Sequence, residues 1–274
     1  ADFTLMPFQN LVESLSGRGP NPLLQNHPLM AIHPPILYIG YVGLVLPFVI
    51  ATSELINKNK NEEWIKIAEK STYMPWVFLT AGISLGAAWS YEVLGWGGYW
   101  AWDPVENVSF IPWLLATAFL HSAKTQIKEF TLLNWNYALS CLMFLSVIFG
   151  TFITRSGVLI SVHAFSNGNI GTYLIIGLTF FTLLFLIIGI KNIEYFQSSS
   201  KVTNFFGRTG FFVANNLLLA ASAIVVFIGT IYPLFYETIY SKQITIGRSF
   251  YDILVGPILL LLIYLMIFST KITK

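Results

Sequence analysis

Residues 171–190, GTYLIIGLTFFTLLFLIIGI, form a run of twenty residues without a charged side chain. A helix of about 20 apolar residues is long enough to cross the hydrocarbon core of a bilayer. Six further mostly apolar runs can be recognised, at 34–53, 73–95, 104–122, 132–154, 211–232 and 250–269. The sequence therefore predicts an all-α polytopic integral membrane protein, a helical bundle with about seven transmembrane helices.

The composition excludes several other classes of protein. Of the 274 residues, 55% are hydrophobic and 10% are charged, whereas about a quarter are charged in a soluble domain. The single cysteine, Cys141, excludes a disulfide framework or a CxxC redox pair within the chain. No basic patch suits nucleic acid, so we expect membrane lipids and other proteins as the surroundings.

The positions of lysine and arginine predict the orientation in the membrane, because positive charge gathers on the inner side. Three connections and the C-terminus, all on one side of the predicted spans, hold 11 of the 15 lysine and arginine residues: Lys58, Lys60, Lys66, Lys70, Lys124, Lys128, Lys191, Lys201, Arg208, Lys271 and Lys274. We therefore expect an outer-face segment at 1–33, a membrane domain at 34–274 with outer loops at 155–170 and 233–249, and an inner C-terminus. An outer N-terminus without an initiator methionine suggests that the chain begins partway through a larger architecture, or after processing.

The tryptophan loop, residues 96–113, WGGYWAWDPVENVSFIPW, joins two predicted spans at the outer face. Its aromatic residues have two readings. Tryptophan and tyrosine are enriched at membrane interfaces in general; alternatively, they offer a stacking surface for a flat ligand. The residues concerned are Trp96, Tyr99, Trp100 and Trp102, with Gly97 and Gly98 allowing a close backbone approach.

The end of the loop predicts a helix start, with Asp103 as N-cap, Pro104 at the first position and Glu106 closing a capping box. We therefore assign these carboxylates no acid–base catalysis.

Three histidines are candidate metal ligands. His33, before the first span, and His163, after the fourth, fall on the outer face and bracket the tryptophan loop. His121 falls about 26 Å deeper, near the inner end of the third span, at 1.5 Å per helical residue. Imidazole binds haem iron at its axial positions, and Arg155 could pair with a haem propionate. Alternatively, His33 is only a polar residue at a helix entry and His163 a surface histidine. An ionisable residue within a span, such as His121, is functional by default. We assign His27 no partner.

The stretch WGGYWAWDPVENVSFIPWLLATAFLHS resembles the tryptophan-rich (WWD) signature of haem-handling proteins, in the form typical of the cytochrome c maturation protein F (CcmF) family. Two flanking stretches, NPLLQNHPLMAIHPPILYIGYVG and GTFITRSGVLISVHAF, agree with it. The resemblance is strong over roughly residues 20–175 and weak over the remainder. The related CcmC and CcsA proteins carry variants of the signature, but the DPVEN continuation and RSGVLISVHAF favour the CcmF family.

The resemblance implies a cytochrome c haem lyase. Such proteins take haem from the carrier CcmE and present it to the CxxCH motif of apocytochrome c, together with CcmH. Positions His33 and His163 match the two ligands of this transient outer haem, and the signature makes Asp103 a further candidate haem-binding residue. A second, b-type haem lies within the membrane between two histidines, of which His121 matches the first.

The chain is shorter than the bacterial members of that family. We expect it to lack their first spans and their C-terminal part, so the second b-haem ligand would come from another CcmF fragment chain. Proteins of this family occur in mitochondria as separately encoded pieces, and the preference for Ile, Phe, Asn and Lys suggests an AT-rich genome, which fits that setting. We therefore expect the mitochondrial inner membrane; a bacterial plasma membrane is the alternative. The rival functions are a non-catalytic haem-binding or haem-export subunit resembling CcmC or CcsA, and a membrane scaffold.

Overall fold

The computed structural model describes residues 27–57, 63–93, 98–129, 131–156, 158–159, 170–197 and 207–271. Most of these residues are helical. The helices are α3 (Pro28–Gly43), α4 (Val45–Asn57), α5 (Glu63–Val93), α6 (Pro104–Glu129), α7 (Leu133–Ser156), α8 (Ile170–Lys191), α9 (Ile193–Gln197), α10 (Arg208–Tyr240) and α11 (Arg248–Lys271). Each predicted span falls within one of these helices to within two residues, except the first, which is divided between α3 and α4, and this confirms the all-α prediction.

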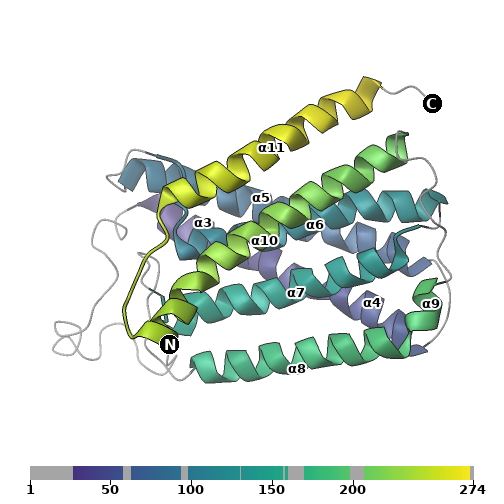
Figure 1. The fold of residues 1–274 in the computed structure, drawn as a ribbon, viewed down its shortest axis with the longest axis horizontal. Coiled ribbons are helices and arrows are strands. Elements are labelled where there is room, and N and C mark those ends of the chain that lie inside the picture. The colour runs from purple at the N-terminus through teal and green to yellow at the C-terminus, as the bar shows by residue number, and fades with distance from the viewer. Residues whose placement is uncertain are drawn as a thin grey trace.

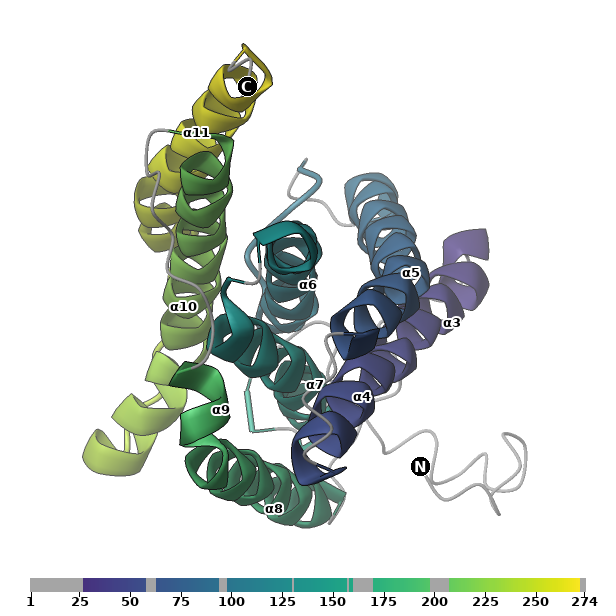
Figure 2. The ribbon, with the colours of Figure 1, turned by 90° about the vertical axis from the view of Figure 1, so that its right-hand side faces the viewer.

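The long helices run lengthwise through the molecule, with α10 and α11 inclined against α3 and α4 (Figure 1). Helix α6 occupies the middle of the bundle and packs against α5, α7 and α10 (Figure 2). Helix α3 packs on α5, α8 packs on α7, and α11 packs on α10. Both ends of α6 are fixed to the α10–α11 pair: Thr209 donates a hydrogen bond to Glu129 at one end, and Trp102 donates one to Asp252 at the other.

Within the described part of the chain, five helical segments are long and apolar enough to cross a membrane: Pro28–Asn57, Leu133–Ser156, Ile170–Lys191, Thr209–Tyr240 and Arg248–Ser269. Helices α5 and α6, which contain the other two predicted spans, do not meet that criterion. In α6 the polar side chains of Asn107, Ser122 and Gln126 are buried. They contact protein instead of lipid, so the central helix of the bundle can be less apolar than the helices around it.

The first predicted span is interrupted. Helices α3 and α4 meet at Leu44, because Pro47 has no N–H to donate to the carbonyl of Gly43, four residues earlier. The start also differs from the prediction: the helix begins at Pro28, with His27 as its N-cap. His33 therefore lies inside α3 and not before the helix. The last six residues of the predicted outer segment, 28–33, belong to this helix.

The connection between the last two long helices is shorter than predicted. Helix α10 continues through Pro233 to Tyr240, and α11 begins at Arg248, so the expected loop at 233–249 is reduced to residues 241–247. A proline within a long helix can kink it without ending it. At the other predicted outer loop, α7 ends at Ser156, so Arg155 is helical. His163, Trp96 and Gly97 lie outside the described residues.

Candidate functional site

His33 is fixed by a hydrogen bond from α3 to α5. Its Nδ1 lies 2.7 Å from the backbone oxygen of Gly82. A carbonyl oxygen can only accept, so Nδ1 carries the proton and the neutral ring has its lone pair on Nε2. Histidines that bind metals commonly donate their second ring N–H to a carbonyl in this way, which sets the tautomer and the ring orientation.

A glycine on α5 makes room for this imidazole. A Cβ atom added to Gly86 would lie 2.7 Å from Cε1 of His33, too close for any real contact. The ring of Trp89, one turn further along α5, lies 5.9 Å from the imidazole centroid at 53°. His33 is therefore set against the backbone of α5 at a position where only glycine fits, with an indole on one side.

His33 and Trp100 line the same narrow cleft between α3, α5 and the start of α6. Val105, Glu106 and Ser109 line it as well, and its volume is about 40 Å³. One water molecule takes about 30 Å³ in the liquid, so the cleft is far too small to enclose a porphyrin. A flat ligand bound through His33 would have to lie over the mouth of the cleft.

The helix start predicted at Asp103 is confirmed. Its Oδ2 accepts a hydrogen bond from the backbone N–H of Val105 at 3.0 Å. The carboxylate of Glu106 accepts from the backbone N–H groups of Asp103, at 3.2 Å, and Ala101, at 2.9 Å. Both carboxylates thus hold the last residues of the tryptophan loop on the end of α6.

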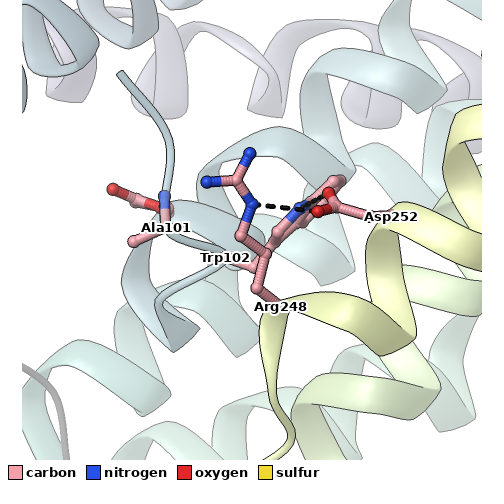
Figure 3. Close-up of polar contacts among 5 residues, drawn as sticks. Ala101, Trp102, Arg248 and Asp252 are labelled. Carbon is pink, nitrogen blue, oxygen red and sulfur yellow. Dashed lines mark hydrogen bonds and ion pairs between the residues drawn. The ribbon is translucent and has the colours of Figure 1, made fainter. Parts of the chain in front are cut away.

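Trp102 has an unusual backbone conformation and is contacted by residues of α6 and α11. Its φ is 59°, in the left-handed region that non-glycine residues rarely adopt. Its backbone oxygen accepts from the side chain of Asn107 at 3.1 Å, and its indole stacks on Tyr251 at 4.9 Å and 11°. The indole Nε1 donates to Asp252 at 2.9 Å, and Arg248 donates to the same carboxylate at 2.9 Å (Figure 3).

The described aromatic residues of the loop face different neighbours. Trp100 lies edge-on to Trp102, with ring centroids 5.8 Å apart at 90°. Tyr99, of which 59% is exposed, stacks on Tyr91 of α5 at 4.4 Å and 9°. The structure brings Trp100 to His33 and turns the indole of Trp102 towards α11. That all these rings form one stacking surface stays a prediction.

Arg155 lies in the last turn of α7 and is half-buried. This end of α7 packs against the start of α6: the hydroxyl of Tyr41 donates to the backbone oxygen of Val108 at 3.2 Å, and Gly150 packs beside both groups. Arg155 is therefore at the same end of the bundle as the tryptophan loop. Gly98 precedes the described aromatic residues of that loop.

His121 lies on the second half of α6, away from the tryptophan loop. Its ring is 5.9 Å from that of Phe212 on α10, at 37°. Its Nδ1 is buried and makes no well-formed hydrogen bond among the described residues, although the backbone of Thr117, one turn earlier on α6, lies close to the ring. A buried polar atom without a well-formed hydrogen bond is costly, and an imidazole nitrogen in this state could bind the iron of a bound haem.

Several residues of the site had no signal in the sequence. His27 caps α3 by accepting from the N–H of Leu29 at 3.2 Å, and its Nε2 lies 2.6 Å from Glu92 at the end of α5. Tyr251 and Asp252 belong to the predicted span 250–269, where nothing in the sequence indicates a contact with the tryptophan loop. Within the described ranges, no three His, Cys, Asp or Glu side chains gather as a metal-ion site.

Comparisons with known proteins give the family. The sequence pattern of the family described as "Cytochrome C assembly protein" matches residues 3–160. The cytochrome c-type biogenesis protein ccl1 of Rhodobacter capsulatus is 42% identical over 252 residues, which are 91% of this chain and 38% of that protein. CcmF of Escherichia coli is 37% identical over 257 residues, 91% of this chain and 39% of its own.

A solved structure described as cytochrome c haem lyase CcmF agrees with the fold. It superposes with a TM-score of 0.71 at 36% identity, over 88% of this chain and 36% of that protein. The chain thus spans roughly two-fifths of the length of the curated relatives it matches. With the fold and the tryptophan loop, these matches show that the chain belongs to the cytochrome C assembly protein family, in which it is similar to the CcmF proteins.

Proposed function

We propose that the chain is the haem-handling part of a cytochrome c haem lyase, which holds haem at the outer membrane face for attachment to the CxxCH motif of apocytochrome c. The observation that carries this is the imidazole of His33, oriented by Gly82 and Gly86 beside Trp100. The similarity to a CcmF haem lyase supports the same function.

In this proposal, haem at the outer face is the substrate. His33 and His163 bind its iron from opposite sides, the indoles of the loop contact the ring, and Arg155 pairs with a propionate. Each CxxCH thiol then adds its sulfur to one carbon of a haem vinyl group and its hydrogen to the other, so the addition needs no oxidant and releases no leaving group. The protein contributes mainly by fixing the ring next to the peptide, which turns a bimolecular encounter into an oriented one.

His121 is the candidate ligand for a second haem, of b type, inside the membrane. What supports this is the buried Nδ1 without a well-formed hydrogen bond among the described residues. Such a haem would supply one-electron chemistry. The second axial ligand would come from another CcmF fragment chain.

The proposed setting is the mitochondrial inner membrane, with the tryptophan loop facing the intermembrane space; the bacterial plasma membrane is the alternative. The positions of the lysines and arginines support this orientation. The proposed partners are a CcmE-like haem carrier, a CcmH-like protein and apocytochrome c.

The test is haem attachment by the assembled complex. The chain is co-expressed with its partner subunits in cells that lack their own lyase, and thioether-linked haem on a co-expressed apocytochrome c is measured. We expect the variant His33→Ala with His163→Ala to lose attachment. His27→Asn, which removes a histidine but keeps an N-cap residue, should retain it. Normal attachment in the double variant would contradict the ligand assignment.

A further inference from the structure

The connection between α10 and α11 contains a stretch of backbone that pairs with no other described segment. Residues 242–247, KQITIG, form no helix, turn or bend, and run as an open trace at one end of the bundle (Figure 1). Ile244 and Ile246 are half-buried, whereas Gln243 and Thr245 are exposed, so the side chains alternate as in a β-strand. Among the described residues, none makes a hydrogen bond to the backbone of 243–246.

This segment forms one wall of a large pocket. The pocket has a volume of about 470 Å³, within the range of ligand sites. Helix α10 supplies a second wall with Pro233, Leu234 and Glu237, and Trp102 lies on a third side. Glu237 is the only charged side chain among the described residues that line it, so the pocket favours a neutral or basic occupant.

The pocket is next to the His33 cleft. Trp102 lines the pocket, Trp100 lines the cleft, and the two indoles touch edge-on with centroids 5.8 Å apart. A ligand in the pocket would therefore be separated from one bound through His33 by these two side chains.

We propose that this pocket binds an extended polypeptide, the CxxCH-containing segment of apocytochrome c, which pairs with the backbone of 243–246 as an added β-strand. Exposed strand backbone is a known template for such pairing. Ile244 and Ile246 then face alternate side chains of the peptide in the pocket, and Glu237 attracts basic ones. The partner named here rests on the proposed function, whereas the unpaired backbone and the pocket do not.

The test measures binding of a fluorescent CxxCH peptide, with both cysteines replaced by serine so that it cannot react, to the purified complex. Thr245→Pro removes one backbone donor, and Thr245→Ala keeps it. We expect Thr245→Pro to weaken binding about tenfold, the effect of one lost hydrogen bond, and Thr245→Ala to leave it nearly unchanged. Glu237→Gln, which leaves the backbone intact, should weaken binding of a basic peptide more than of a neutral one.

The two proposals are separated by measuring haem binding in the same samples, through the absorption that depends on His33. Peptide affinity that is equal in wild type, Thr245→Pro and Glu237→Gln, with haem bound normally, would overturn the docking site alone. Amides of 243–246 that are protected from hydrogen exchange before peptide is added would also overturn it, because another segment would already cover them. If the wild-type complex shows no His33-dependent haem absorption, but Thr245→Pro still weakens peptide binding, only the proposed function is overturned.

Discussion

The indole N–H of Trp102 donates a 2.9 Å hydrogen bond to Asp252, a residue 150 positions later in the chain. This contact joins the end of the tryptophan loop to the first turns of α11. Tyr251 stacks on the same indole and itself packs against Gly229 of α10, where an added Cβ would lie 2.7 Å from its ring. The conformation of the loop therefore depends on the last two long helices.

Replacement of Asp252 tests this dependence. In Asp252→Ala the indole loses its acceptor, which is one of the contacts that hold Trp102 in its observed conformation. We expect the rate of haem attachment to fall several-fold while the amount of folded complex stays the same. Asp252→Asn keeps a carbonyl acceptor and should retain most of the rate. Equal rates in both variants would show that the hydrogen bond does not position the loop.

Gly86→Ala should displace the imidazole of His33. Alanine is favoured over glycine within a helix by about 1 kcal/mol, which offsets part of the cost of moving the imidazole, so we expect the variant still to fold. Its methyl group nevertheless occupies the space of Cε1. We expect a loss of outer-face haem binding in absorption titrations.

The matched control is Gly177→Ala on α8, where an added Cβ has nothing within 4 Å. It makes the same chemical change in a long helix and should leave haem binding intact. Unchanged haem affinity in Gly86→Ala would mean that His33 does not bind haem in the observed orientation.

Substitutions of Asp103 separate a structural from a chemical role. If Asp103 acts as N-cap, Asp103→Ala costs about 1 kcal/mol in the free energy of unfolding, and Asp103→Asn much less, because asparagine also caps helices. Thermal unfolding of the purified complex and haem titration measure both properties. Haem affinity lost equally in the two variants would instead indicate that the carboxylate contacts haem.

His121→Ala should remove the intramembrane haem. We expect the b-type signal in reduced-minus-oxidised spectra to disappear, while haem titrated onto the outer face still binds. Phe212→Leu, which changes the aromatic neighbour of His121 but not the imidazole, should retain the signal. A full b-type signal in His121→Ala would contradict the assignment.

The sequence predicts much of the fold because each element has a local signal. Apolar runs of span length mark the helices, and the Asp103–Glu106 pattern marks the start of α6. The helix boundaries at Pro28 and Tyr240 differ from the prediction, because the predicted spans begin at Pro34 and end just before Pro233. Within a packed bundle these prolines are accommodated in the helices.

The site could be predicted only where its signal is local. The aromatic residues of the loop and the three histidines stand out by residue type. The contacts that orient them do not: Gly82 and Gly86 look like ordinary span glycines, and Asp252 lies 150 residues from its partner. These contacts arise from the packing of α3 on α5 and of α11 on α10, which no pattern in one sequence reveals.

The most direct test of the account is the axial ligation of the outer-face haem. The complex is prepared with His121→Ala, which removes the b-type haem, and loaded with haem for low-temperature electron paramagnetic resonance. We predict a low-spin signal of two imidazole ligands, lost in the further variant His33→Gly and restored by added imidazole. The same two-imidazole signal in His33→Gly without added imidazole would contradict the account.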